Sequence, residues 1–310
     1  MKFKVLAGLV AAAASLMAGQ AQAGAVGIAN MNVTALGFAA PNAPTINITN
    51  ESRTGTAAAS YNGNPATGVG ANSITKSGAV DVDVKNRCAG ACGAATQALY
   101  NGTAGGLENA TNHISVPGSA NYALGDMFIS GTAIGGNIQG LTRADAVATG
   151  PNNAGGSNAT IQNGGLITGQ FTTATTFTSA IVLGVDAFLQ AWVDPAGLSN
   201  ANATASFGWN MKIQGSDGSS LIFAPVDLNQ GFSTSDPLFN TFNYFSTNGT
   251  TAYFSDVFTF KQGVIYQFTI NQSSNATVED VSRIPEPASL ALLGVALAGA
   301  GWVSRRRKAA

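Results

Sequence analysis

The stretch Phe177–Val185, which reads FTSAIVLGV, indicates the fold of this chain most clearly. Its odd-numbered positions are mostly large and apolar, and they share one face of an extended strand because side chains alternate between the two faces. The apolar run continues through Phe188–Val193 and ends at the turn pair Asp194-Pro195. The stretch therefore predicts a β-strand with one face against a core.

The same two-residue period recurs in other segments that turn-forming residues separate. It predicts strands at Val26–Phe38, around Ile46 and Ile48, at Val80–Val84, at Phe207–Ile213 and at Val264–Ile270. Gly215–Gly218 predicts a hairpin turn that leads to Leu221 and Phe223. Phe254, Phe258 and Phe260 are expected to face one way, with a turn at Gln262-Gly263 that makes them the hairpin partner of the strand that follows.

Two segments depart from the strand pattern. Cys92–Tyr100 is rich in alanine and predicts the only short helix between the two ends of the chain. Gly150–Gly165 is dense in Asn, Gly and Ser, and we interpret it as a long surface loop or an interdomain linker. The pattern as a whole predicts an all-β fold, a β-sandwich of jelly-roll or immunoglobulin-like type, over residues 24–283. These residues suffice for one large domain or two smaller ones, divided near 150–165.

The carboxyl-terminal end predicts a membrane anchor. Pro285-Glu286-Pro287 precedes an uncharged, apolar run at 288–303, which a helix can place in a bilayer because it satisfies its own backbone groups. The basic tail of Arg305, Arg306, Arg307 and Lys308 is typical of a stop-transfer signal and stays on the cytoplasmic side. Residues before Pro285 are then expected outside the membrane.

This three-part end, residues 284–310, resembles the PEP-CTERM sorting signal of Gram-negative bacteria. The resemblance implies that Pro285, Glu286 and Pro287 are recognised by exosortase, a polytopic membrane cysteine protease that removes the tail. It also implies that the protein is anchored transiently in the inner membrane and then passed to the cell surface or the extracellular polysaccharide. The two prolines fit this role, because they resist helix formation and keep the tripeptide extended and accessible.

The amino-terminal end, residues 1–23, predicts a Sec-type signal peptide. Lys2 and Lys4 precede an apolar stretch at Val5–Met17, and Ala21 and Ala23 provide the small residues of a signal peptidase site. We expect cleavage after Ala23. The Sec export machinery and signal peptidase are therefore expected partners, together with exosortase.

Composition restricts the function of the segment between the signals. Charged residues are only 9% of the chain and the formal net charge is −1, with the only basic cluster in the tail. Nucleic-acid binding needs clustered Lys and Arg, so no nucleic-acid partner is expected. The abundant hydroxyl and amide side chains suit contact with hydrated exopolysaccharide, and biased composition in a loop-rich fold explains them equally well.

Cys88 and Cys92 are the only cysteines, and in an exported protein they predict one small disulfide loop. A redox or metal site is the alternative, but the pair has the spacing Cys-x-x-x-Cys with no second pair, a closed zinc site needs four ligands, and His113 is the only histidine. Asp81-Val82-Asp83 and Asp217-Gly218-Ser219 resemble fragments of calcium loops, and we interpret both as solvated turns. No metal and no cofactor is expected.

No pattern in the sequence predicts catalysis. A Ser-His-Asp or Cys-His scheme would need His113 as its base, and the sequence contains no G-x-S-x-G nucleophile elbow. No catalytic residue is therefore assigned. We expect a non-enzymatic structural protein of the cell surface or extracellular matrix. The alternative is a carbohydrate-binding module or adhesin, in which Trp192 or Trp209 would stack on sugars, although such aromatic stripes more often belong to a core. A secreted hydrolase is the third hypothesis.

Overall fold

The computed structural model describes residues 24–281 except for 40–42, 45, 47, 67–72, 92–120, 136, 150–152, 194–199 and 236–241. The predicted signal peptide, the predicted helix at 92–100, His113 and the whole sorting segment 284–310 therefore lie outside the described residues. In the part of the chain that the structure describes, no helix is long and apolar enough to cross a membrane.

Nearly all of the described chain is antiparallel β-sheet, so the prediction of an all-β fold is confirmed. The 7-stranded sheet contains, in spatial order, β14 (Phe242–Ser246), β10 (Ile181–Val193), β1 (Gly24–Phe38), β7 (Gln139–Thr149), β6 (Tyr122–Ser130) and β5 (Val82–Gly90), with β15 (Thr251–Phe254) also paired to β10. The 8-stranded sheet contains β12 (Ser220–Phe223), β11 (Asn200–Gly215), β17 (Tyr266–Val281), β8 (Asn153–Phe171), β2 (Ser52–Tyr61) and β3 (Asn64–Pro65), with β13 (Asn229–Thr234) on β11 and β4 (Ser73–Ser77) on β2.

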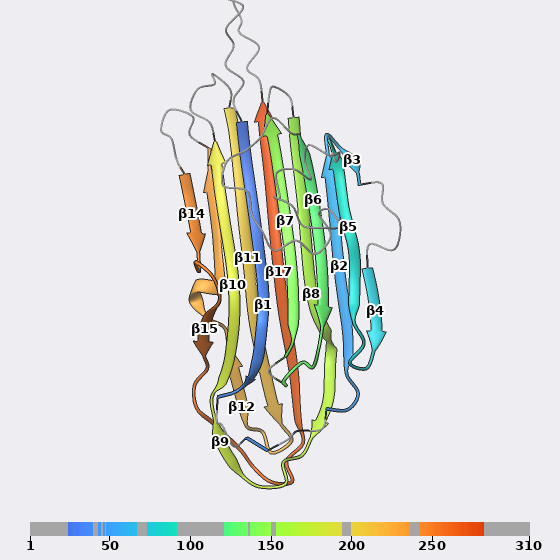
Figure 1. Cartoon of the computed structure of the whole chain (residues 1–310), viewed down its shortest axis with the longest axis vertical. Helices are drawn as coiled ribbons and strands as arrows, with labels where there is room; N and C mark the ends of the chain where they lie inside the picture. The colour runs from blue at the N-terminus through green and yellow to red at the C-terminus, as the bar shows by residue number, and fades with distance from the viewer. Residues whose placement is uncertain are drawn as a thin grey trace, which may run out of the picture.

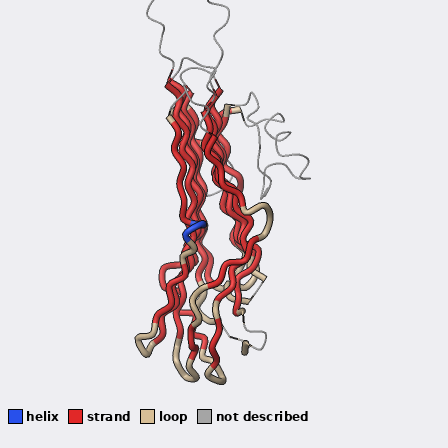
Figure 2. Tube along the Cα trace, turned by 90° about the vertical axis from the view of Figure 1, so that its left-hand side faces the viewer, coloured by secondary structure: helices blue, strands red, loops and turns tan. Residues whose placement is uncertain are grey.

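The two sheets pack face to face along their length, as Figures 1 and 2 show from two directions. The amino end of β1 and the carboxyl end of β17 lie at the same end of the stack, at the top of Figure 1. We call this the terminal end and the opposite one the distal end. A small third sheet, β9 (Phe177–Ser179) with β16 (Phe258–Phe260), lies at the distal end, and the only helical turn in the described chain is η1 (Val226–Leu228).

Large side chains fill the space between the sheets toward the distal end. Trp209, Phe268 and Tyr266 are all buried there, and Tyr266 stacks on Phe171 with ring centroids 5.1 Å apart. Phe260 packs edge-on against Tyr266 at 5.2 Å. Aromatic pairs of this kind add stability beyond the area that they bury, so this end holds the main core.

Small side chains fill the same space at the terminal end. The buried cluster there consists of Ala25, Ala144, Ala146, Ala148, Ala191, Val193, Ala201, Ala203, Ala276 and Val278. The sheets approach so closely that a Cβ added at Gly27 would lie 2.5 Å from the carbonyl oxygen of Thr204 and 3.2 Å from that of Thr277. Only glycine therefore fits at this point of β1.

A buried polar bridge separates the two parts of the interior. The Gln272 side-chain amide, on β17, donates to the carbonyl oxygens of Met31 at 2.8 Å and Gly140 at 3.0 Å in the opposite sheet. Beside it the hydroxyls of Thr142 and Ser274 hydrogen-bond each other at 2.9 Å. Because buried polar groups cost free energy unless they are paired, this bridge favours one relative position of the two sheets.

The structure corrects the prediction for 150–165. Residues 153–171 form β8, which pairs with β17 on one side and with β2 on the other. A loop or linker there was predicted because the segment has few large apolar residues, but a strand between two others needs only backbone pairing. Strands from both sides of this segment share each sheet, since β1 pairs with β10 in one sheet and β8 joins β2 to β17 in the other.

The predicted hairpin between Phe254–Phe260 and Val264–Ile270 is also wrong. β16 pairs with β9, whereas β17 pairs with β11 and β8. Phe254 belongs to a different strand, β15, and is 62% exposed, so it does not share a face with the buried Phe260. The strand expected around Ile46 and Ile48 is absent too, although both side chains pack against the core.

Candidate functional site

The two tryptophans proposed as sugar platforms occupy different surroundings, and neither is a free aromatic face. Trp209 on β11 is fully buried and packs edge-on against Phe223, with ring centroids 5.3 Å apart. Trp192 on β10 is half-buried and packs against a second apolar cluster on the outer face of the 7-stranded sheet. The stripe Phe207, Trp209, Met211 is therefore core, as its period indicated.

The two buried ion pairs are closed to solvent. Arg53 contacts Glu51 at 2.5 Å, and Arg143 contacts Asp145 at 2.7 Å, with every one of these side chains at most 3% exposed. Arg53 also donates to the carbonyl oxygen of Gly131 in the other sheet. A substrate could not reach these groups, so we assign them to the framework.

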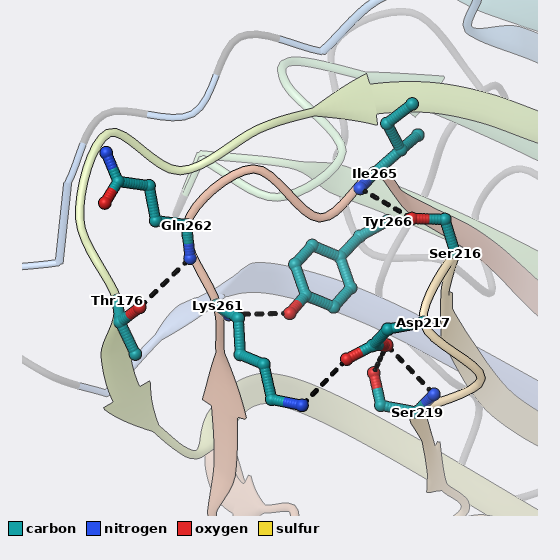
Figure 3. Close-up of polar contacts among 8 residues, drawn as sticks. All are labelled: Thr176, Ser216, Asp217, Ser219, Lys261, Gln262, Ile265 and Tyr266. Atoms are coloured by element: carbon teal, nitrogen blue, oxygen red, sulfur yellow. Dashed lines mark hydrogen bonds and ion pairs between the residues drawn. The ribbon is translucent and has the colours of Figure 1, made fainter.

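The distal turns contain an exposed polar network, drawn in Figure 3. The Lys261 ammonium contacts Asp217 at 2.9 Å, and the backbone N–H of Ser219 donates to the same carboxylate at 3.0 Å. The hydrogen bond from the Ser219 side chain, with that from Lys261, holds the pKa of Asp217 far below its usual range. The hydrogen bond to Asp217 raises the pKa of Lys261. Both groups are thus charged at neutral pH, which makes them poor proton acceptors or donors.

The rest of this network ties neighbouring turns together. The Tyr266 hydroxyl accepts a hydrogen bond from the backbone N–H of Lys261 at 2.7 Å, and Thr176 accepts one from Gln262 at 3.1 Å. The backbone N–H of Ile265 donates to the Ser216 hydroxyl at 3.2 Å (Figure 3). These bonds satisfy turn N–H groups that have no strand partner. Asp217 is therefore a turn residue whose oxygens already have donors, as the interpretation of a solvated turn implies.

An open groove lies between the two sheets at one lateral edge. One wall is the end of β12 with the segment into η1, residues 222–227, and the other is the end of β15 with the residues after it, 253–256. Both strands lie in the lower half of Figure 1. The groove has a volume of about 400 Å³. The groove presents exposed apolar and acidic side chains.

Side chains at the groove combine exposed apolar surface with negative charge. Ile222, Val226 and Phe254 are 68%, 81% and 62% exposed. Asp227 and Asp256 line opposite walls. Burial raises the pKa of Tyr253, and the negative charge of Asp227 raises it further. The groove therefore presents a surface of mixed apolar and acidic character.

Sequence reasoning missed this groove. Phe254 was assigned to a buried face, and Pro225-Val226-Asp227 carried no recognisable motif. The groove forms only where the edges of two sheets meet, so no local pattern marks it.

The predicted processing residues are not placed by the fold. Pro285, Glu286, Pro287, the tail Arg305–Lys308, and Ala21 with Ala23 lie outside the described residues. Cys88, on β5, is disulfide-bonded. Cys92 is outside the described part, so the Cys88–Cys92 pairing stays a prediction. Among described residues no group of three or more His, Cys, Asp or Glu side chains is placed to hold a metal ion.

Comparison with known proteins identifies the carboxyl-terminal segment. Residues 283–308 match the family model described as the PEP-CTERM protein-sorting motif. No curated protein and no solved structure matches the chain. The motif implies export, a membrane-anchored sorting signal and exosortase as the processing partner. Residues 283–308 thus carry a PEP-CTERM protein-sorting motif, and the resemblance noted in the sequence of this segment is confirmed.

Proposed function

We propose that this chain is a non-enzymatic structural protein of the cell surface or extracellular matrix, where it is associated with exopolysaccharide. The observation that carries the proposal is the position of the sorting motif, which begins two residues after β17 ends. A long two-sheet stack then stands directly on the segment that exosortase processes. The fold of this stack is a β-sandwich in the broad sense of two packed antiparallel sheets.

The geometry supports a rod that is attached at one end. β1 begins and β17 ends at the terminal end, so a signal peptide and a sorting signal would both act there. β17 has 16 residues and spans roughly 50 Å at about 3.3 Å per residue. While the chain is anchored, the distal turns and the lateral groove therefore face away from the membrane.

The chemistry of the described residues favours a non-enzymatic role. Catalytic acids and bases are usually titratable groups with pKa values moved toward neutrality, in a pocket that a substrate can enter. Here the pKa of Asp217 moves down and that of Lys261 moves up, each away from neutrality, and the buried carboxylates of Glu51 and Asp145 are paired with arginines. These features support a binding or structural protein over a secreted hydrolase.

Intact-mass measurement of the protein from the outside of the native cell tests the proposal. We expect a species that lacks Trp302 and the Arg305–Lys308 cluster, recovered with the extracellular polysaccharide. In a strain without its exosortase the tail should be retained and the protein should stay with the membrane. The matched control is Glu286→Gln, which keeps the prolines, the helix and the tail but removes the charge of the tripeptide. Full-length protein outside wild-type cells, or no protein in the matrix fraction, would refute the proposal.

The adhesin hypothesis remains as the second candidate, and the groove favours it. The sugar platform expected at Trp209 is part of the core, so that form of the carbohydrate-binding hypothesis loses its surface. The groove instead offers apolar side chains and carboxylates at the membrane-distal half of the stack.

A further inference from the structure

We infer that the groove between residues 222–227 and 253–256 is a docking site for an extended, basic and partly apolar segment of a partner polypeptide. This docking site does not depend on the proposed matrix role. The protein could associate with the matrix and bind no peptide in the groove, or bind a peptide there and not associate with the matrix, and the two experiments distinguish these cases. Three properties of the groove support it: its apolar side chains, its charge and its open strand edge.

Exposed apolar side chains gather at the groove. Ile222 and Val226 project from one wall and Phe254 from the other. Val257, also 71% exposed, follows directly after the second wall. Single exposed apolar residues are ordinary on protein surfaces, but a contiguous group beside a concavity marks an interaction site. The partner should therefore insert at least one apolar side chain.

Charge determines which kind of partner fits. Asp227 and Asp256 line the groove, and no Lys, Arg or His is among its lining residues. The charge of Asp227 is felt inside the groove, because it raises the pKa of Tyr253. Lys and Arg side chains complement this arrangement, since they can pair with the carboxylates and lie over the ring of Phe254.

The charge of the whole stack points the same way. Residues 24–281 contain fourteen acidic and seven basic side chains, because half of the basic residues of the chain lie in its two ends. A second copy of this stack or an anionic polysaccharide would be repelled at long range, whereas a basic segment would be attracted. A basic polypeptide is thus the occupant that the electrostatics favour.

The strand edge explains why the partner should be extended and short. β15 pairs with β10 alone among the described strands, so its other edge has backbone groups that an added strand could use. The edge is only four residues long, and Asn248 and Gly249, both with positive φ, interrupt the line between β14 and β15. Interruptions of this kind protect edges from long edge-to-edge pairing. A short peptide can still pair there.

Peptide binding to the purified mature protein tests the inference. The probe is an array of short synthetic peptides that vary independently in charge and apolar content. We expect binding of peptides that combine Arg or Lys with Leu, Ile or Phe, and no binding of their Glu counterparts. Affinity should fall as salt is raised, because exposed charges are screened. Asp227→Asn combined with Asp256→Asn should weaken binding on the order of tenfold and reduce the salt dependence.

Matched variants separate the groove from other surfaces. Phe254→Ser should weaken binding by a similar factor and leave thermal unfolding unchanged, because this side chain is already exposed. Asp81→Asn is the control, since Asp81 is exposed beside β5 at the opposite edge. Equal effects of Asp81→Asn, or no bound peptide, would overturn the inference. Neutral oligosaccharides bound in a Phe254-dependent way, or self-association lost in Phe254→Ser, would also overturn it and identify a glycan or a second copy as the occupant.

Discussion

The two ends of the stack are built from the same strands and differ in side-chain size. On β17 the inward residues are Ala276 and Val278 at the terminal end, and Tyr266 and Phe268 at the distal end. On β11 the corresponding change is from Ala203 to Trp209. The same two sheets enclose the small side chains at one end and the large side chains at the other. The distance between the sheets is therefore set by the volume of the side chains between them, and not by backbone pairing within each sheet.

This difference implies opposite sensitivities. The distal end buries large aromatic surfaces, so its stability depends on volume that a substitution can remove. The terminal end buries only small side chains, so a substitution can remove little volume there. Its backbones are so close together that it cannot accommodate a larger side chain. If the stack is attached at its terminal end, its main core and its exposed groove lie in the part that faces away from the membrane.

The largest effect is expected at Phe268, which is 1% exposed in the distal core. Phe268→Ala should reduce the free energy of unfolding by about 3 to 5 kcal/mol, a large share of the 5 to 15 that is typical of a domain. Val278→Ala at the terminal end is the matched control. It removes two methyl groups and should cost only about 1 to 2 kcal/mol at ~0.8 per buried methylene. Urea unfolding of both variants measures the difference. Equal losses in the free energy of unfolding would contradict the difference in side-chain size between the distal and terminal ends.

The next largest effect is expected at Gly27, where a substitution adds side-chain volume to the terminal end. Gly27→Ala places a Cβ 2.5 Å from a backbone oxygen of Thr204, so the sheets must separate, at a cost of about 1 to 3 kcal/mol. Gly208→Ala is the control, because a Cβ there would meet only the side-chain oxygens of Ser273 and Asn229, at 3.3 and 3.4 Å, and no backbone atom. Thermal unfolding should show a clear loss for the first variant and almost none for the second. A neutral Gly27→Ala would mean that the sheets separate freely.

Period two was a sufficient guide wherever a strand has one large apolar face. The strands at Val26–Phe38 and Phe207–Ile213 were predicted for this reason and are confirmed. The strand predicted at Phe177–Val185 is divided at Ala180 into β9 and β10, which belong to different sheets. The hairpin at Gly215–Gly218 was predicted from its turn residues and is confirmed. Each of these strand segments carries large apolar side chains on one face, and burying that face fixes which side of the strand points to the core. The prediction of an all-β fold followed from them.

The same reasoning failed where strands are small or exposed. Residues 153–171 have little apolar surface, and their place in the sheet comes from backbone pairing to β17 and β2, which the sequence does not display. Phe254 was placed on one face with Phe258 and Phe260 because of its spacing from them in the sequence. Its exposure depends on where two sheet edges meet, so the groove could be found only after the strands were arranged in space.

The smallest effect is expected from the exposed network at the distal turns, which tests whether this end depends on its core alone. Lys261→Met removes the ammonium that contacts Asp217 and keeps most of the aliphatic chain. The folded-state pKa of Asp217 is lowered from 3.8, so its contribution is present above that pH and is lost as the pH falls through the lower folded value. The pKa of Lys261 is raised from 10.5, so the contribution is lost again as the pH rises through that higher folded value.

The difference in urea midpoint between wild type and Lys261→Met should therefore be small at neutral pH and should narrow below about pH 4. High salt should narrow it as well, because both groups are exposed. Lys212→Met is the control, since this exposed lysine on β11 lies opposite Ile222 and should show no such pH dependence. If the midpoint difference were the same at all pH values, the turns would be held by the backbone hydrogen bonds to Tyr266, Thr176 and Ser216 alone, and the ion pair would contribute nothing to the distal end.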